Sequence, residues 1–278
     1  MSEETDIPTA IITGASAGVG KAAARQLLAQ GWRVIGQGRD AERCAAAEAE
    51  LAHPHFTLLR ADLSLMADVA RLVQDIAART NRIDALINNA GGVRATQSVS
   101  SEGFEATFAA NHLAPFLLTT RLLPILRASK ARVIAVSSTG HEHCPGINWD
   151  DLNFHASWSS GVAYCQAKLC NILFARELAR REGPHGIISH AMHPGVVASN
   201  FASHCEPGMK AYMQTLDGQP PDVPAQTLVW LATAAEPAQI NGRYFYNLAE
   251  AKSSTLAQDN AAAAMLWEMS ERLIAPYR

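Results

Sequence analysis

Tyr164 and Lys168 are two side chains whose spacing suits proton transfer. They are four residues apart, so on a helix they lie on one face about one turn from each other. A phenol titrates near pH 10 and is a poor acid–base group at neutral pH, but an ammonium held beside it favours the phenolate. The pair therefore predicts acid–base chemistry, although Tyr-x-x-x-Lys alone is also typical of a surface pair on an amphipathic helix.

A run of three glycines lies where a strand-like segment meets a helical one. The segment T-G-A-S-A-G-V-G, residues 13–20, follows an apolar run and precedes an Ala-rich stretch. Glycine permits a tight turn there and lets backbone amides approach a pyrophosphate at the positive end of the helix dipole. A glycine triplet alone also fits an ordinary turn, but the flanking strand and helix favour a dinucleotide site. The residues expected to line it are Gly14, Ser16, Ala17, Gly18, Val19 and Gly20.

The end of the second predicted strand indicates which dinucleotide binds. NAD enzymes place an acid there for the ribose 2′-hydroxyl, whereas a nearby arginine accommodates a 2′-phosphate. Here Gly38 ends the strand and Arg39 follows it. A guanidinium pairs well with a phosphate, while the neighbouring Asp40 and the lack of a basic residue in the glycine turn weaken the argument. We predict NADP(H) in preference to NAD(H).

These residues need a scaffold, and the chain alternates β-rich runs with helical stretches. The predicted strands are 9–13, 33–37, 55–59, 83–87, 132–136, 187–190 and 244–246. The predicted helices are 18–30, 41–52, 66–79, 102–128, 160–182, 224–235 and 256–273. This rhythm predicts an α/β fold: one doubly wound Rossmann-type domain over residues 1–278 with a seven-stranded parallel sheet. Two irregular segments, 139–159 and 196–223, are expected to be substrate loops.

Composition excludes several classes of protein. The chain has 278 residues, of which 48% are hydrophobic and 18% charged, and its net charge is −3, so a globular fold is expected and nucleic acid is not an expected partner. No run approaches about 18 apolar residues, and the N-terminal residues are acidic and polar, so we expect a cytoplasmic protein without a membrane span. Five cysteines without a C-x-x-C pair fit reduced thiols. The cluster His141-Glu142-His143-Cys144 lacks the spacing of a zinc site, and we expect no metal.

Several motifs together resemble the short-chain dehydrogenase/reductase family, over residues 13 to about 245. T-G-x-x-x-G-x-G at 13–20 resembles that family's cofactor turn, Asp62-Leu63 its adenine-contacting pair, and N-N-A-G at 88–91 its stretch after the fourth strand. Within the family, N-H-L-A-P-F-L-L-T at 111–119 and A-Y-C-Q-A-K-L-C-N-I-L-F at 163–174 look most like the retinol-dehydrogenase-like branch. That branch mostly uses NADP(H), in agreement with Arg39.

The resemblance implies a catalytic group of Asn111, Ser138, Tyr164 and Lys168. Ser138, at the end of the fifth strand, would hold the substrate oxygen beside Tyr164, and Asn111 would anchor a water that links Lys168 to solvent. The segment H-P-G-V-V-A-S at 193–199 looks like the stretch that covers the nicotinamide, with Ser199 where the family more often has threonine. The further cofactor contacts that the resemblance implies are Asp62, Leu63, Asn89, Ala90, Gly91, Pro194, Gly195, Val197 and Ser199, besides Tyr164 and Lys168.

The sequence thus predicts an NADP(H)-dependent oxidoreductase that moves hydride between nicotinamide and the carbonyl or alcohol of an apolar small molecule. Phe154, Trp158, Met209, Tyr212 and Met213 could wall its pocket, or could simply pack the two long loops. Two other hypotheses remain: a C=C double-bond reductase on the same fold, and a non-catalytic NADPH-binding regulatory protein. The resemblance also implies a homodimer or homotetramer that pairs through helices 102–128 and 160–182.

Overall fold

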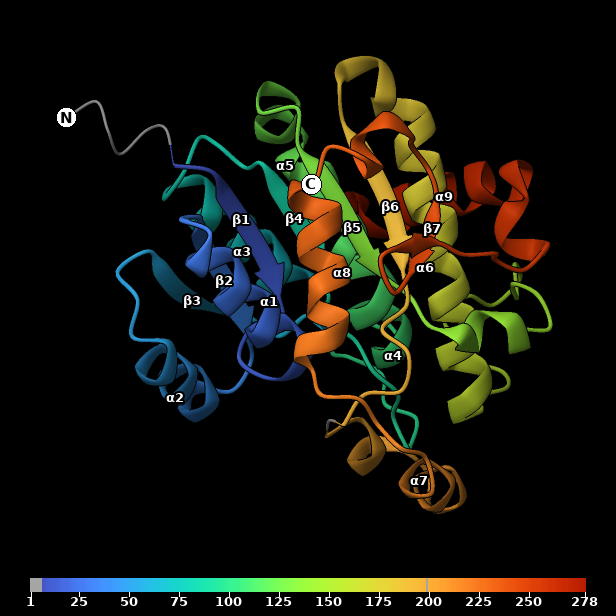
Figure 1. Ribbon diagram of the computed structural model, residues 1–278. Coiled ribbons are helices and arrows are strands. Elements are labelled where there is room, and N and C mark those ends of the chain that lie inside the picture. Colours follow the sequence, from blue (N-terminus) through green and yellow to red (C-terminus); the bar gives the residue numbers. More distant parts are fainter. Residues whose placement is uncertain (1–6, 199) are drawn as a thin grey trace.

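Parallel strand pairing organises the chain. The computed structural model describes residues 7–198 and 200–278, and in this part of the chain eight strands form one sheet in the order β3-β2-β1-β4-β5-β6-β7-β8 (Figure 1). The strands are β1 (Thr9–Thr13), β2 (Arg33–Gly38), β3 (Phe56–Arg60), β4 (Ala85–Asn88), β5 (Arg132–Val136), β6 (Ile188–Met192), β7 (Tyr244–Tyr246) and β8 (Ala249–Glu250). The order reverses between β1 and β4, and open α/β sheets bind ligands at such a point, beyond the carboxyl ends of the strands.

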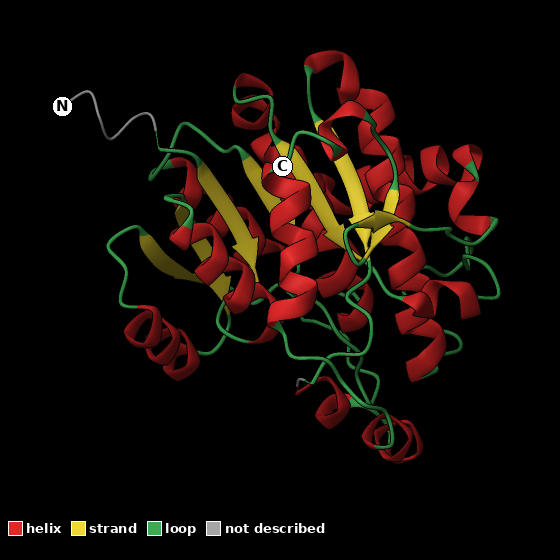
Figure 2. Cartoon of the chain, in the orientation of Figure 1, coloured by secondary structure: helices red, strands yellow, loops and turns green. Residues whose placement is uncertain are grey.

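Helices cover both faces of the sheet (Figure 2). They are α1 (Gly18–Ala29), α2 (Ala41–Leu51), α3 (Met66–Ala77), α4 (Ala106–Phe108), α5 (Ala114–Ala128), α6 (Ser160–Glu182), α7 (Pro207–Gln214), α8 (Asp222–Thr233) and α9 (Asn260–Ile274). One apolar core lies under α1 and α8, and the other lies under α3, α5, α6 and α9. The expected single α/β Rossmann-type domain is therefore confirmed.

At β7 and β8, the last two strands of the order, the sheet differs from the prediction of seven parallel strands. β7 pairs parallel to β6, but the short β8 turns back and pairs antiparallel to β7. The two residues between them, Asn247 and Leu248, both have positive φ, 47° and 63°, as a tight hairpin turn requires. An Asn-Leu turn lacks the glycine that usually marks such a hairpin, so no sequence pattern predicted the eighth strand.

The predicted helix 102–128 is interrupted. It begins at Ala106, passes through a π-helical segment, Ala109–Leu113, and continues as α5. Asn111 lies in the π-helical segment, and its side-chain amide donates to the carbonyls of Thr107 (2.8 Å) and Gly92 (3.0 Å). Such segments are rare overall, and many of those known lie at functional sites.

The structure also differs from the prediction in segments 196–223 and 256–273. The predicted irregular segment 196–223 contains α7, which has no buried residue and extends away from the sheet at the bottom of Figure 1. The predicted helix 256–273 is a 3₁₀ turn, Leu256–Gln258, followed by α9, because the Asp259 carboxylate accepts from the amides of Ala261 and Ala262 and starts a new helix. The structure describes no helix long and apolar enough to cross a membrane.

The helix α9 closes the far side of α6. Its Trp267 ring packs edge-on against Phe116 of α5, 4.8 Å between ring centroids, and stacks on Phe174 of α6 at 6.0 Å. Aromatic contacts of this kind add to the free energy gained by burying their surface. As a result, α6 is nearly enclosed between the sheet and α9.

Gln37 is a buried polar residue that ties three strand ends together. It is 3% exposed, its Oε1 accepts from the Gly14 amide (3.0 Å), and its Nε2 donates to the Ala61 carbonyl (2.7 Å). Gln37→Leu would leave both backbone groups unpaired, at about 1–3 kcal/mol for each. Chemical denaturation should show that Gln37→Leu lowers the free energy of unfolding by at least the cost of one such unpaired group. The exposed control Gln30→Leu should change it by no more than about 0.5 kcal/mol. Equal stability of the two variants would contradict this role.

Candidate active site

The glycine turn after β1 forms a cradle that side chains would fill. Gly14 has φ +69°, and a Cβ on Gly20 would lie 2.4 Å from the Gly14 carbonyl oxygen, so both positions require glycine. The helix α1 starts at Gly18, and its N-cap Ala17 makes no side-chain cap. The first amides of α1 therefore have no side-chain cap, and a Cβ on Gly18 would meet no other atom within 4 Å, so this helix end fits a pyrophosphate.

Residues after β4 hold this turn in place. The Thr13 hydroxyl accepts from the amides of Asn89 and Ala90, both at 3.0 Å, and the Asn89 side-chain amide donates to the Thr13 carbonyl at 2.8 Å. Asn89 and Ala90 thus lie against the turn, whereas the resemblance implied only that they contact the cofactor. The geometry gives the Asn89 amide group a supporting role, because it binds the backbone of the turn.

The strand end that follows carries an exposed arginine. Arg39 is exposed directly after β2. Asp40 next to it caps α2, since its carboxylate accepts from the Arg43 amide at 2.9 Å. A Cβ on Gly38 would lie 2.5 Å from the Cys44 sulfur, so an acid at Gly38 would not fit without rearrangement. Asp40, which weakened the sequence argument for a phosphate, is therefore engaged in a cap.

Asp62 and Leu63 lie at the adjacent strand end. The Ala61 amide donates to the Gly38 carbonyl (3.1 Å), which brings the end of β3 beside that of β2. Asp62 accepts from the Ser64 amide at 2.9 Å, and Leu63 is buried. The pair thus lies at the strand end next to the one that Arg39 follows.

The second part of the site joins β5 to α6. Lys168 is 4% exposed, and its ammonium donates to the Val136 carbonyl at 3.1 Å. The Ser137 hydroxyl donates to the Lys168 carbonyl at 2.6 Å. Tyr164 lies one turn earlier on α6, with its ring centroid 5.5 Å from the Lys168 Nζ. The predicted placement of both side chains on one helix face, next to the end of β5, is therefore what the structure shows.

The Tyr164 hydroxyl and Ser138 form the centre of this part. The Ser138 hydroxyl hydrogen-bonds Tyr164, but burial outweighs this contact and raises the pKa of Tyr164 to about 12. Burial also lowers the pKa of Lys168 to about 8. The sequence argument gave a lowered phenol pKa, and in the chain alone its sign is the reverse because desolvation dominates. A phenol with a raised pKa is held protonated, as a proton donor must be.

Gly91 joins the two parts of the site. A Cβ on it would lie 2.3 Å from Asn111 Oδ1 and 3.1 Å from Lys168 Nζ, so it requires glycine here. The Asn111 Oδ1 also accepts from the Gly92 amide at 3.0 Å. The segment after β4 therefore contacts the glycine turn through Asn89 and the Lys168 ammonium through Gly91.

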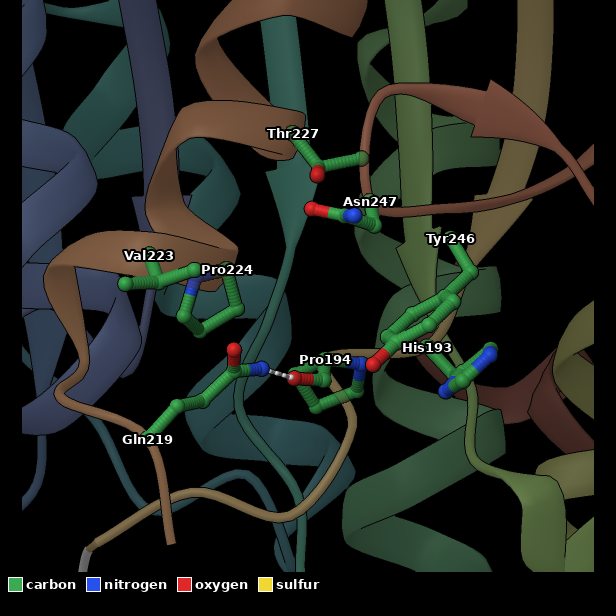
Figure 3. Close-up of a pocket in the computed structure, with 8 residues that line it drawn as sticks. All are labelled: His193, Pro194, Gln219, Val223, Pro224, Thr227, Tyr246 and Asn247. Carbon is green, nitrogen blue, oxygen red and sulfur yellow. Dashed lines mark hydrogen bonds between the residues drawn. The ribbon is translucent and has the colours of Figure 1, made fainter.

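The segment after β6 lines the pocket drawn in Figure 3, together with residues of β7 and of the loop before α8. The Gln219 side chain points to the Pro194 carbonyl and donates to it at 2.7 Å, and Val197 pairs with Gln219 in a parallel bridge. Gly195 has φ +71°, and a Cβ on it would lie 2.9 Å from the Gln219 amide nitrogen. Gln219 was not singled out from the sequence, where nothing distinguishes it from other loop glutamines. The predicted contact Ser199 lies outside the described residues.

Other residues near Tyr164 also had no sequence signal. The Phe201 ring lies 5.4 Å from that of Tyr164, and the neighbouring thiols of Cys165 and Cys205 contribute to its raised pKa. Phe201 and Cys205 belong to the loop between β6 and α8, and only the tertiary fold brings them to α6. These groups form an apolar surround for the phenol.

Two of the residues expected to wall a substrate pocket, Phe154 and Trp158, instead pack within the protein. The Trp158 indole donates to Glu105 at 3.2 Å, and Phe154 is 4% exposed, with its carbonyl accepting from Gln97. Both therefore pack the 139–159 loop against the domain, as the simpler alternative had it. Met209 and Tyr212 on α7 are 48% and 59% exposed.

Comparison with known proteins identifies the class. The model of the short chain dehydrogenase family matches residues 8–210. Human retinol dehydrogenase 13 is 36% identical to this chain, in an alignment that covers 96% of this chain and 84% of that protein. Human retinol dehydrogenase 12 is 34% identical, in an alignment that covers 95% of this chain and 85% of that protein. The chain belongs to the short-chain dehydrogenase/reductase family, in its retinol-dehydrogenase-like branch.

Solved structures give the same fold. A crystal structure of an uncharacterized protein from Mycobacterium paratuberculosis superposes with a TM-score of 0.78, at 30% identity over 97% of this chain and 96% of that one. An active-site complex of Pseudomonas aeruginosa RhlG with NADP superposes with a TM-score of 0.69, at 29% identity over 85% of this chain and 93% of that one. The family binds nicotinamide cofactors and carries out hydride-transfer oxidoreduction at alcohol and carbonyl groups.

Proposed function

We propose that this protein is an NADP(H)-dependent oxidoreductase that interconverts a carbonyl and an alcohol of a fairly apolar small molecule. The observation that carries the proposal is the contact of a protonated, half-buried Tyr164 with the Ser138 hydroxyl, one helical turn from the buried Lys168 ammonium. When bound, the nicotinamide supplies or accepts the hydride at the carbon atom. The residues of the chain must then handle the oxygen and its proton.

Ser138 and Tyr164 act on the substrate oxygen. The Gly140 amide donates to Ser138 Oγ at 3.0 Å, so the serine hydroxyl proton can donate to Tyr164 and, once a substrate is bound, to the substrate oxygen. Tyr164 gives its proton to the oxygen as negative charge develops there during reduction. In the direction of oxidation the same phenol acts in reverse, since it accepts the proton of the alcohol after giving up its own.

Lys168 and Asn111 replace the proton. A Lys168 ammonium stabilises the phenolate that Tyr164 becomes, and its lowered pKa makes it a proton source near neutral pH. Asn111, in the π-helical segment beside Gly91, anchors the water that connects Lys168 to solvent. Its side-chain hydrogen bonds to Gly92 and Thr107 fix the carbonyl groups around that position.

Arg39 supports the preference for NADP(H). Its exposed guanidinium directly follows β2, where we expect the ribose to bind, the acid beside it is engaged in capping α2, and Gly38 offers no carboxylate. The NADP complex of the RhlG structure agrees with this preference.

The substrate class rests on two observations. The surround of Tyr164 by Phe201, Cys165 and Cys205 is apolar, and the similar human proteins are named for retinol, an apolar alcohol. The proposed loops 139–159 and 196–223 border this side of the site, so they select the substrate. An aldehyde or ketone on an apolar body fits best.

The proposal extends to the state of the protein in the cell. The chain acts as one domain over residues 1–278 in the cytoplasm, which the five free cysteines support because reducing compartments keep thiols unpaired. It works as a homo-oligomer. Since α9 covers one side of α6, a subunit contact through α5 would use exposed residues such as Pro124 and Arg127.

Tyr164→Phe tests the proton donor directly. Removal of one hydroxyl should lower kcat for carbonyl reduction about 10²- to 10⁴-fold, the contribution of a general acid. The dissociation constant of NADPH, followed by fluorescence titration, should stay near the wild-type value. Substantial remaining turnover would contradict the assigned mechanism.

Arg39→Asp tests whether Arg39 contacts the ribose 2′-phosphate of NADP(H). Loss of a charge-assisted contact to the 2′-phosphate should weaken NADPH relative to NADH by about 10- to 100-fold, measured as the ratio of their kcat/KM values. Arg272→Asp makes the same change of net charge on the distant α9 and should leave the ratio unchanged. An unchanged ratio in Arg39→Asp would mean that this residue does not contact the phosphate.

The pH dependence follows from Lys168. Its pKa of about 8 means that the ammonium is present below that pH and is lost as the pH rises through it. Carbonyl reduction should therefore be level below about pH 8, and kcat should fall toward tenfold per pH unit above it, while Tyr164 with its pKa of about 12 remains protonated. NADPH affinity measured at each pH separates this from a loss of binding. A level kcat up to pH 10 would contradict the assignment to Lys168.

A further inference from the structure

His141 is a fully buried residue three positions after Ser138, with both ring nitrogens in hydrogen bonds. Its Nδ1 lies 2.7 Å from the Ser138 carbonyl oxygen, and the Ser254 amide lies 3.1 Å from its Nε2. A backbone amide only donates, so Nε2 must be the acceptor and the ring proton must be on Nδ1. The contacts therefore select one neutral tautomer, in which Nδ1–H donates to the Ser138 carbonyl. Burial, which lowers the pKa of His141, favours the same neutral state.

Ser138 is held at two atoms by the 3₁₀ turn that contains His141, Thr139–His143. Its carbonyl accepts from both the Nδ1–H and the backbone amide of His141, the latter at 3.1 Å, while its Oγ accepts from the Gly140 amide. The carbonyl contacts fix the peptide, and the Oγ contact fixes the direction of the hydroxyl. Without the imidazole the carbonyl would keep only the longer backbone contact.

The other side of His141 faces the C-terminal part of the chain. Ser254 follows β8, and the Ser254 hydroxyl accepts from the Ala257 amide, so the donor to Nε2 belongs to an ordered turn. The His141 ring also packs edge-on against Tyr244 of β7, with centroids 5.1 Å apart. His141 therefore links residues 251–258 and the sheet edge to the strand end that carries Ser138.

We infer that His141 is a positioning residue for the reaction: its neutral imidazole joins the C-terminal segment to the Ser138 peptide and so orients the hydroxyl that contacts Tyr164. The inference rests on the proposed role of Ser138. A buried histidine that only filled space would need neither hydrogen bond, and a phenyl ring would replace it without effect on the reaction. Orientation, in contrast, is needed only while the substrate oxygen is bound.

His141→Phe separates these two roles, because the phenyl ring retains packing against Tyr244 and loses both hydrogen bonds. We expect kcat for carbonyl reduction to fall about 10- to 100-fold, as for a small misplacement of a catalytic group, with an unchanged dissociation constant for NADPH. The matched control is His143→Phe, the same change at an exposed position of the same turn, which should keep wild-type kcat. A His141→Phe enzyme as active as the control would overturn the inference.

A double-mutant cycle with Ser138→Ala tests the route of the effect. If His141 acts through Ser138, His141→Phe should cost little further activity once the Ser138 hydroxyl is absent. Independent, additive losses would overturn the inference, and so would a parallel loss of NADPH affinity. Full activity of Ser138→Ala alone would instead refute the proposed function of Ser138, which distinguishes the two failures.

His141→Asn provides rescue, and a second test should His141→Phe fold poorly. The Asn side-chain amide can donate to the Ser138 carbonyl from nearly the position of Nδ1, but it does not extend to Ser254. We expect its kcat to recover most of the difference between His141→Phe and the wild type. A His141→Asn kcat as low as that of His141→Phe, in an enzyme with normal NADPH affinity, would overturn the inference.

Discussion

The burial of the Lys168 ammonium is the constraint on which the active site depends. A cation removed from water is costly unless it is hydrogen-bonded, and the Val136 carbonyl at the end of β5 accepts its proton at 3.1 Å. Asn171, one turn later on α6, donates to the same carbonyl at 3.0 Å. These contacts fix the register of α6 against β5. Tyr164 consequently meets Ser138, and the pKa of Lys168 falls toward neutrality because desolvation disfavours its charged form.

The cofactor end and the reacting end are parts of one framework. The peptides after β4 support the glycine turn through the Thr13 hydroxyl and approach Lys168 and Asn111 through Gly91. A nucleotide bound along the amino end of α1, as proposed, would lie on a surface that also holds Lys168 and Asn111 in place. Preorganisation of this kind lets the protein orient the reactants without rearrangement at the moment of reaction.

Much of this organisation could be predicted from sequence, because it depends on local patterns. Apolar runs, the glycine turn and the four-residue spacing of Tyr164 and Lys168 each specify structure within a few residues. Most of the failures have tertiary causes. The pKa of Tyr164 rises because other elements bury it, and Phe201 comes close to it from a loop far along the chain. Asn111, in the π-helical segment, bonds the Gly92 carbonyl of another segment. The β7–β8 hairpin was missed for a local reason, because its Asn-Leu turn contains no glycine.

The most direct test of hydride transfer to a carbonyl follows the hydride itself. The protein would be incubated with NADPH deuterated at C4 of the nicotinamide and an apolar α,β-unsaturated aldehyde, and the position of deuterium in the product would be read by NMR and mass spectrometry. We expect an allylic alcohol with deuterium on the carbinol carbon and the C=C bond intact. Deuterium on the β-carbon of a saturated aldehyde would contradict the account and assign a C=C reductase to the same fold.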